Sequence, residues 1–150
     1  MALNIKLRKF RISDLDRILR IEKSSFSSVD AYSKRRFQCL YRKHPQDFIV
    51  AEKVNEIVGY IIAYGKKGFV DFNSIAVDKS HRNLGIGSLL INSVFKRFRN
   101  RGFKKALLEV RMTNRKAMSF YKKIGFKIKK TIKKFYKDGQ GAYRMEKSLS

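Results

Sequence analysis

The chain has 150 residues, of which 43% are hydrophobic, and it carries a formal net charge of +24 at neutral pH. This length suits one domain with a sizeable core, and the apolar content excludes a disordered polycation. No apolar run reaches membrane-spanning length, and the single cysteine, Cys39, excludes an internal disulfide. We therefore expect one domain over residues 1–150 in the cytoplasm, because the alternating residues 1–8 also lack the apolar core of a secretion signal.

The positive charge is unevenly distributed along the chain. Residues 1–75 hold 15 basic and 8 acidic side chains, whereas residues 76–150 hold 21 basic and 4 acidic ones. Eight lysines between positions 122 and 137 dominate this excess. Such a surface favours solubility, and it also fits contact with RNA, for example the ribosome, or with another polyanion.

Periodicity and turn residues predict the elements of the first half in chain order. A strand is expected over about residues 4–10, followed by a helix that Ser13 and Asp16 would cap. Another helix is expected to start after Ser33 and to end before Pro45. Three strands follow at about 47–53, 57–65 and 69–77, the first two joined by a turn at Val54-Asn55-Glu56.

The turn after the third of these strands carries the strongest local signal. Arg82-x-x-Gly85-x-Gly87 opens a helix whose predicted apolar face comprises Ile86, Leu89, Leu90, Val94 and Phe98. Glycine lets the backbone curl so that several N–H groups face one point beside the positive end of the helix dipole. This geometry predicts a phosphorylated ligand, although many strand-to-helix turns use glycine for backbone freedom alone. The sequence does not fit a P-loop or a dinucleotide fingerprint.

A second pattern lies further along the chain. A strand is expected over about 105–111, and Glu109 is the one acid within its apolar run. Asn114 is a good N-cap for a helix that Gly125 would end. Strands near 126–136 and 142–148 close the chain around a turn at Asp138-Gly139. Together the elements predict a mixed α/β chain.

These two patterns, in this order and at this separation, resemble the GNAT superfamily of acyl-CoA-dependent N-acetyltransferases. The second reads Leu-Leu-Glu-Val-Arg-x-x-Asn-x-x-Ala-x-x-Phe-Tyr from Leu107 to Tyr121, and the resemblance covers nearly the whole chain. Within the superfamily, the chain looks most like the enzymes that acetylate protein N-termini, of the bacterial ribosomal-protein-alanine and archaeal types. The resemblance implies a central, mostly antiparallel twisted sheet with a splayed parallel pair and flanking helices.

The resemblance also implies the residues of the site. Glu109 would help to deprotonate the substrate amine, and Tyr121 would protonate the departing CoA sulfur. Strand alternation offers a simpler interpretation of Glu109, on a solvated face or paired with Arg111. Backbone N–H donors at Ile75–Val77 would stabilise the tetrahedral intermediate. Acetyl-CoA would be the co-substrate, bound by Ile75, Ala76, Val77, Arg82, Asn83, Leu84, Gly85, Ile86, Gly87, Ser88, Asn114, Ala117 and Tyr121.

The acceptor pocket departs from the family pattern. Phe26, Tyr32 and Tyr136 are the candidate substrate-binding residues, and each could equally serve packing. The bacterial enzymes carry a Pro-Trp pair after the phenylalanine and the archaeal ones a Pro-Tyr pair, whereas this chain has Ala31-Tyr32. Related chains also carry an acidic pair where Gln140-Gly141 stands here.

Three functions remain open from the sequence. The first is acetyl transfer from acetyl-CoA to the N-terminal α-amine of a protein, ribosomal proteins included, by direct attack in a ternary complex. The second is acetylation of a lysine or of a small amine such as a polyamine. The third is a non-catalytic basic RNA- or ribosome-binding protein on the same fold, against which the intact motifs argue. No metal site is expected, because His44 and His81 are isolated, and Cys39 is expected to pack in the core.

Overall fold

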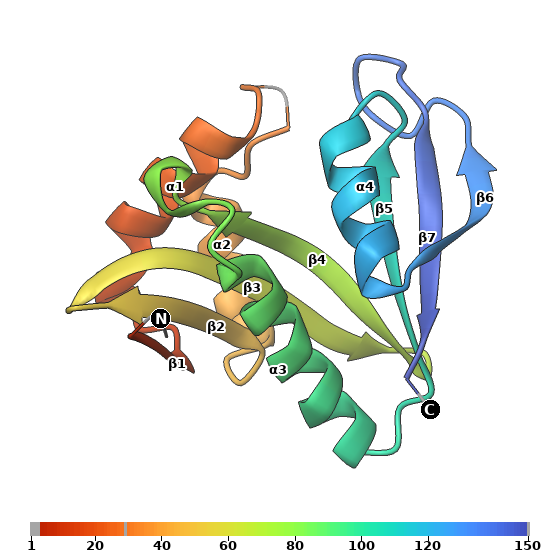
Figure 1. The fold of residues 1–150 in the computed structure, drawn as a ribbon. Coiled ribbons are helices and arrows are strands. Elements are labelled where there is room, and N and C mark those ends of the chain that lie inside the picture. The colour runs from red at the N-terminus through yellow and green to blue at the C-terminus, as the bar shows by residue number, and fades with distance from the viewer. Residues whose placement is uncertain (1–3, 29, 150) are drawn as a thin grey trace. The chain divides into compact units, whose positions relative to one another are not determined.

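The computed structural model describes residues 4–28 and 30–149, so the first three positions of the expected N-terminal pattern lie outside it. Strands and helices follow one another along this part of the chain (Figure 1). Their bounds are β1 (Ile5–Lys9), α1 (Leu15–Ser25), α2 (Lys34–Lys43), β2 (Phe48–Lys53), β3 (Glu56–Lys66), β4 (Phe69–Val77), α3 (Ile86–Asn100), β5 (Lys105–Arg111), α4 (Arg115–Ile124), β6 (Lys127–Ile132) and β7 (Ala142–Ser148). None of these helices has the length and apolar character needed to cross a membrane.

The strands form a sheet in the order β1-β2-β3-β4-β5-β7-β6. The pairs β1–β2, β2–β3, β5–β7 and β6–β7 are antiparallel. Strands β4 and β5 are parallel, with Val70 opposite Ala106 and Asp71 opposite Leu107. Parallel neighbours need a crossover connection, and α3 provides it. The expected mixed fold, with a mostly antiparallel sheet and a parallel pair, is confirmed.

Two compact units make up the chain. The first unit comprises residues 1–64 and 73–94, and the second unit comprises residues 65–72 and 95–150. Helices α1 and α2 and the turn after β4 belong to the first unit, whereas β5, α4, β6 and β7 belong to the second.

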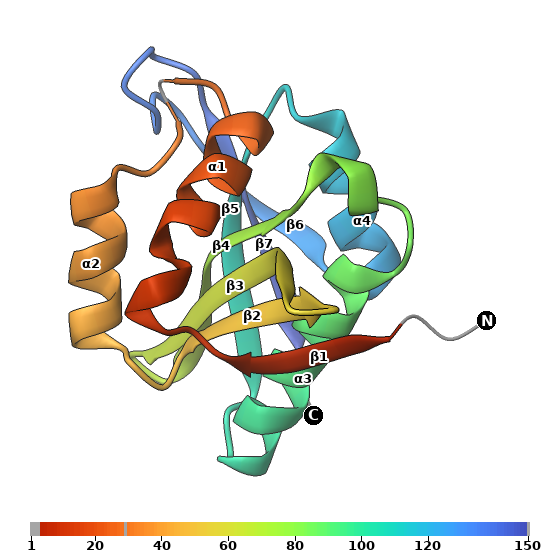
Figure 2. The ribbon, with the colours of Figure 1, turned by 90° about the vertical axis from the view of Figure 1, so that its left-hand side faces the viewer.

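Apolar spacing along α1 builds the core of the first unit. Leu15, Ile18 and Ile21 recur on one face of the helix and are buried. With α2, this face lies against strands β2 and β3 (Figure 2). The first-unit cluster comprises Phe10, Leu15, Ile18, Ile21, Phe37, Phe48, Val50, Ile57, Tyr60, Ile62 and Ala76. Burying one large apolar side chain contributes roughly 1.5–3 kcal/mol, so the cluster fixes both helices on the strands.

Gly59 allows α3 to approach the opposite face of β3. The neighbouring Tyr60 belongs to the first-unit cluster, so strand alternation turns Gly59 to the other side. A Cβ added at Gly59 would lie 3.2 Å from the carbonyl oxygen of Ala76 and 3.5 Å from Cγ2 of Ile86. The first turn of α3 therefore packs directly on β3, and this contact fixes the turn that precedes the helix.

Aromatic side chains hold the second unit together. The rings of Phe72, Phe95 and Phe126 contact one another, with centroids 5.5 to 6.0 Å apart. Gly125 ends α4 as expected, in the left-handed conformation that glycine favours, with φ of 115°. Because the chain turns at Gly125, Phe126 enters this cluster directly after the helix.

The expected cap of α1 by Ser13 and Asp16 is wrong. Residues Ile12–Asp14 form a turn of 3-10 helix, and Asp14 stands immediately before α1. The carboxylate of Asp14 accepts the backbone N–H of Arg11 at 2.8 Å and two bonds from the guanidinium of Arg8 at 2.8 and 2.9 Å. Charge-assisted bonds of this kind are stronger than a serine cap, so they decide how the helix begins.

Two further expectations need correction. Leu89 is 42% exposed and lies off the buried face of α3, where Ile91 and Phe95 lie instead. The strand expected over 126–136 ends at Ile132. Lys134 adopts a φ of 53°, which a strand cannot accommodate, so the chain turns there.

Candidate active site

The turn between β4 and α3 has the geometry of an anion site. Asn83 and Gly85 adopt φ angles of 63° and 85°, which curl the backbone just before the helix begins at Ile86. The first N–H groups of a helix have no partner within it and lie at the positive end of its dipole. Nothing lies within 4 Å of a Cβ placed on Gly85. There is therefore free space beside Gly85 on the side where a Cβ would stand.

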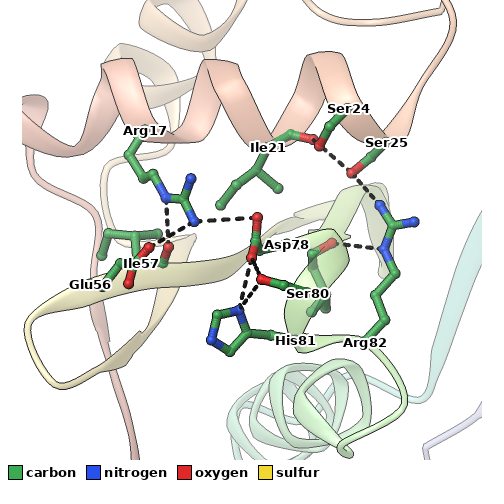
Figure 3. Close-up of polar contacts among 11 residues, drawn as sticks. Arg17, Ile21, Ser24, Ser25, Glu56, Ile57, Asp78, Ser80, His81 and Arg82 are labelled. Atoms are coloured by element: carbon green, nitrogen blue, oxygen red, sulfur yellow. Dashed lines mark hydrogen bonds and ion pairs between the residues drawn. The ribbon is translucent and has the colours of Figure 1, made fainter.

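The side chain of Arg82 is engaged by protein groups. Its Nε donates to the carbonyl of Val77 at 3.0 Å, and its Nη2 donates to Oγ of Ser25 at 3.0 Å (Figure 3). Ser25 is the last residue of α1 and Val77 is the last of β4. The guanidinium joins the ends of these two elements.

Asp78 organises the segment that leads into this turn. One of its oxygens accepts from Oγ of Ser80 at 2.6 Å and lies 2.8 Å from Nδ1 of His81, and the other lies 3.3 Å from Nη2 of Arg17 (Figure 3). The bond from Ser80, together with His81 and Arg17, holds the pKa of Asp78 below its usual value. Ser80 and His81 meet the same oxygen, so the three residues brace the loop and do not form a nucleophilic relay.

Arg17 extends this bracing to β3. Its Nε donates to the carbonyl of Ile57 at 3.0 Å, and its Nη2 lies 3.2 Å from Oε1 of Glu56. The backbone N–H of Asp78 donates to the carbonyl of Val58 at 2.8 Å. Helix α1, the start of β3 and the end of β4 are therefore tied together immediately before the turn.

The expected backbone donors lie at the end of β4. Ala76 is buried in the first-unit cluster, whereas Ile75 and Val77 are half-buried. Side chains alternate along a strand, so Asn73, Ile75 and Val77 share one face of β4.

Glu109 lies on the half-exposed face of β5, between two buried positions, as strand alternation predicts. Its Oε2 accepts from Nε of Arg144 at 3.0 Å, and the two residues are register partners on β5 and β7. Arg111, the partner considered from the sequence, instead pairs with Asp138 at 2.8 Å. The Glu109 carboxylate is therefore held by a cation from the neighbouring strand.

Helix α4 carries the expected phenol. Asn114 caps the helix, because its Oδ1 accepts the backbone N–H of Ala117 at 3.1 Å. The ring of Tyr121 packs edge-on against Phe126, with centroids 5.8 Å apart. Although Tyr121 as a whole is half-buried, burial of its hydroxyl raises the pKa of that group, and the nearby Tyr136 raises it further. The phenol therefore keeps its proton at neutral pH.

The loop after β6 places Tyr136 near Tyr121. The guanidinium of Arg111 lies 4.1 Å from the centroid of the Tyr136 ring, and it also donates to Asp138 at 2.8 Å. The backbone N–H of Tyr136 donates to the carbonyl of Gln140 at 3.0 Å, which closes the loop. Tyr136 is also close enough to Tyr121 to raise the pKa of its hydroxyl.

A hollow of about 580 Å³ lies over one side of α4. Its lining residues are Arg115, Met118, Ser119, Lys122 and Lys123. This spacing puts all of them on one face of the helix. Because three of them are cations, the hollow suits an anionic group.

Phe26 and Tyr32 lie between α1 and α2, and both are half-buried against the first-unit cluster. The hydroxyl of Tyr32 donates to Oδ1 of Asn73 at 2.9 Å, and the guanidinium of Arg36 lies 4.2 Å from its ring centroid. The backbone N–H of Tyr32 donates to Oε2 of Glu22 at 2.8 Å. Tyr32 is therefore held at its backbone, its ring and its hydroxyl.

Three of these partners were not identified from the sequence. Glu22 follows Ile18 by four residues and so lies on the apolar face of α1. An acid on such a face is a sequence signal that could have identified Glu22 as a buried carboxylate. Arg144 lies opposite Glu109 because of the register between β5 and β7. No local sequence pattern predicts that register. Asn73 likewise meets Tyr32 only through tertiary packing.

The other candidates behave as simple structural residues. Cys39 is half-buried on α2, and His44 stacks on Tyr64 with ring centroids 3.8 Å apart. Across residues 4–28 and 30–149, no group of three or more His, Cys, Asp or Glu side chains could hold a metal ion.

In the first unit a curled glycine turn at a helix start suits a phosphorylated ligand, and the second unit by itself holds a carboxylate and a protonated phenol. Residues 14–126 match the acetyltransferase (GNAT) family, and the chain belongs to it. The protein is therefore an N-acetyltransferase, and its co-substrate is acetyl-CoA. The family, the enzyme class and the co-substrate expected from the sequence are confirmed.

Similarity to individual members extends over nearly the whole chain. An N-alpha-acetyltransferase of Sulfolobus acidocaldarius is 32% identical over 98% of this chain and 94% of its own length. The crystal structure of Ard1 from Thermoplasma volcanium has a TM-score of 0.90 and 28% identity, covering 97% of this chain and 98% of that one. Naa20 of Chaetomium thermophilum, in complex with a bisubstrate analogue, has a TM-score of 0.82 and 26% identity over 95% of this chain and 86% of its own.

Proposed function

We propose that this protein transfers the acetyl group of acetyl-CoA to the N-terminal α-amine of a protein, by direct attack in a ternary complex. The observation that carries the proposal is the similarity to N-alpha-acetyltransferases over nearly the whole chain. Ribosomal proteins are among the acceptors that we propose, because the basic surface suits a substrate that is made and assembled on RNA.

The turn over residues 82–88 is the proposed site of the acetyl-CoA pyrophosphate. The fit rests on the open space at Gly85 and on the N–H groups at the start of α3. Residues Ile75–Val77 are the proposed donors to the thioester oxygen, and Asn114 and Ala117 are further proposed contacts of the co-substrate. In this role the turn binds and orients the donor, and it needs no side-chain charge from Arg82.

Glu109 is the proposed base. An α-amine has a pKa near ~8 and a lysine amine near ~10.4, so a modest base suffices for the first. As the amine nitrogen attacks the thioester carbonyl carbon, Glu109 takes its proton, directly or through one water. Arg144, 3.0 Å from the carboxylate, keeps the base in one orientation.

Tyr121 is the proposed acid. As the carbon–sulfur bond breaks, the phenol gives its proton to the departing sulfur, which leaves as free CoA beside the new amide. The phenol is protonated at neutral pH, so Tyr121 has a proton to give to the sulfur.

One experiment tests the acceptor. The protein is incubated with labelled acetyl-CoA and a panel of N-terminal peptides, peptides with an internal lysine and a blocked N-terminus, and polyamines. Mass spectrometry then places the label, and we expect it on the α-amine. Label confined to internal lysines, or to polyamines, would overturn the acceptor and leave the donor assignment standing. Absence of transfer to any amine would favour the non-catalytic alternative.

We further propose that the basic part of the second unit contacts a polyanion such as ribosomal RNA. The eight lysines between positions 122 and 137 are all exposed. Binding to purified ribosomes should weaken steeply between about 50 and 200 mM salt, and binding that ignores salt would contradict the proposal. We propose the cytoplasm as the compartment, where the single thiol of Cys39 stays reduced.

A further inference from the structure

Glu22 is a buried carboxylate that the proposed chemistry does not use. It is 1% exposed and lies on the apolar face of α1 beside Ile18 and Ile21. Its Oε1 accepts from the hydroxyl of Tyr60, and its Oε2 accepts the backbone N–H of Tyr32 at 2.8 Å. Both of these partners are neutral donors, so neither of them compensates the buried charge as an ion pair would.

A carboxylate in this position works against the stability of the fold. Burial disfavours the charged form, and an apolar residue of the same size would fit the face that Ile18 and Ile21 define. The hydrogen bond to Tyr32 is the feature that an apolar residue could not supply. It joins α1 to a position ten residues later, in the segment between α1 and α2.

We propose that Glu22 is a positioning residue for the acceptor: it fixes Tyr32 against β4. The proposal deepens the proposed function, on which it rests for the role of Tyr32 at the acceptor. Glu22 touches no reacting atom and acts through Tyr32.

Tyr32 in turn contacts Asn73 of β4. With its backbone N–H on Glu22, Tyr32 places its hydroxyl 2.9 Å from Oδ1 of Asn73. The amide of Asn73 in turn donates to the hydroxyl of Tyr64 at 3.2 Å. Asn73 shares a strand face with Ile75, two residues further along β4. A loose Tyr32 would therefore lose its fixed position beside β4, where the acceptor is proposed to bind.

The charge on Glu22 sets the strength of this anchor. Three groups face it from the surrounding elements: Tyr60 from β3, Tyr32 from the connecting segment and Arg36 from α2. Burial raises the pKa of Glu22 to about 7, against the lowering effects of the Tyr32 N–H and Arg36. Because an ionised carboxylate is the stronger acceptor, the anchor should tighten as pH rises through this value.

Steady-state kinetics on three variants test the proposal, with whichever amine the wild type acetylates as acceptor. Glu22→Leu removes the acceptor atom and should raise the KM of the amine about tenfold. Its kcat and its KM for acetyl-CoA should stay within about twofold, since no reacting group is touched. Glu22→Gln keeps a carbonyl for the Tyr32 N–H and should recover most of the loss. Ile18→Val, the matched control, loosens the same helix face without touching the anchor and should leave the KM of the amine unchanged.

The pH dependence of the amine KM distinguishes the effect of the charge on Glu22 from the effect of its shape. Between pH 6 and 8 the KM of the amine should fall more steeply for the wild type than for Glu22→Gln. Because both proteins act on the same amine, the ionisation of the amine affects the two profiles equally and does not cause this difference. Equal profiles together with an unchanged KM in Glu22→Leu would overturn the proposal, as would an equal rise of KM in the Ile18→Val control.

Amide hydrogen exchange gives a readout that needs no activity. The N–H of Tyr32 should be protected in the wild type and in Glu22→Gln, and it should exchange at least about tenfold faster in Glu22→Leu. Equal protection in all three proteins would overturn the anchor even if acetylation fails altogether. If the wild type acetylates no N-terminal peptide but the protection follows this pattern, the proposed function fails and the anchor stands.

Discussion

Replacing Glu22 by glutamine should remove a pH dependence from the stability of the fold. Glutamine keeps the size and the hydrogen-bonding oxygen of the side chain and cannot ionise. In the folded protein burial raises the pKa of Glu22 to about 7, whereas the ordinary value of 4.5 applies to the unfolded chain. The folded state therefore binds the proton more tightly than the unfolded state does. This contribution to stability is fully present below pH 4.5 and is lost as pH rises through about 7. The difference corresponds to about 3 kcal/mol.

Urea unfolding at pH 5 and pH 8 measures this effect. The free energy of unfolding of the wild type, minus that of Glu22→Gln, should fall by about 2–3 kcal/mol between the two pH values. Asp14 and Asp78 have lowered pKa values and titrate below this range. All other side chains are common to the two proteins, so their contributions cancel in the difference. A difference that does not change between pH 5 and pH 8 would refute the reasoning, because Glu22 would then be as easily ionised in the fold as in water.

Three changes test the proposed chemistry. Gly85→Val forces a branched side chain into a φ of 85° and fills the open space beside the turn, so calorimetry should show acetyl-CoA affinity reduced at least ~tenfold. The control is Gly68→Val, at a position with a φ of 86° and equally open space. Equal acetyl-CoA affinities of the two variants would mean that the turn does not bind the donor. Tyr121→Phe should lower kcat by roughly 10²–10⁴-fold with little change in acetyl-CoA affinity, whereas wild-type turnover would mean that the ring only packs. Glu109→Gln should cut turnover at neutral pH and recover part of it at higher pH, where the amine loses its proton unaided; a constant deficit at every pH would argue against a base.

Local patterns predicted most of the fold because each carries its own physical cause. Asn114 and Gly125 mark the ends of α4 by a side-chain cap and a left-handed turn, and both act on the adjacent backbone alone. The start of α1 could not be predicted in the same way. Asp14 is held there by Arg8, a residue of β1, and a capping pattern within the helix does not include that partner. The early end of β6 depends on the conformation of one lysine, Lys134, which no residue preference favours.

The same distinction applies to the site. The glycine turn and the residues Glu109 and Tyr121 stand in a sequence pattern, so the pattern could name them. Their partners come from other strands and loops. Arg144 meets Glu109 through strand register, and Tyr136 approaches Tyr121 through the fold of the loop after β6. Glu22 was visible as an acid on an apolar helix face, but its partner Tyr32 was not.

The position of β6 has a consequence for how the protein behaves in concentrated solution. Among the strands of residues 4–28 and 30–149, β6 comes last in the sheet order, so one of its sides has no neighbouring strand and is an edge that a second chain could extend. Lys127, Lys129 and Lys130 line the strand and are exposed. Two such edges repel each other in dilute buffer, whereas at about 1 M salt the repulsion reaches only ~3 Å. The charged lysines thus oppose aggregation through pairing of β6 strands. Their repulsion persists during purification in low salt and is screened in high salt.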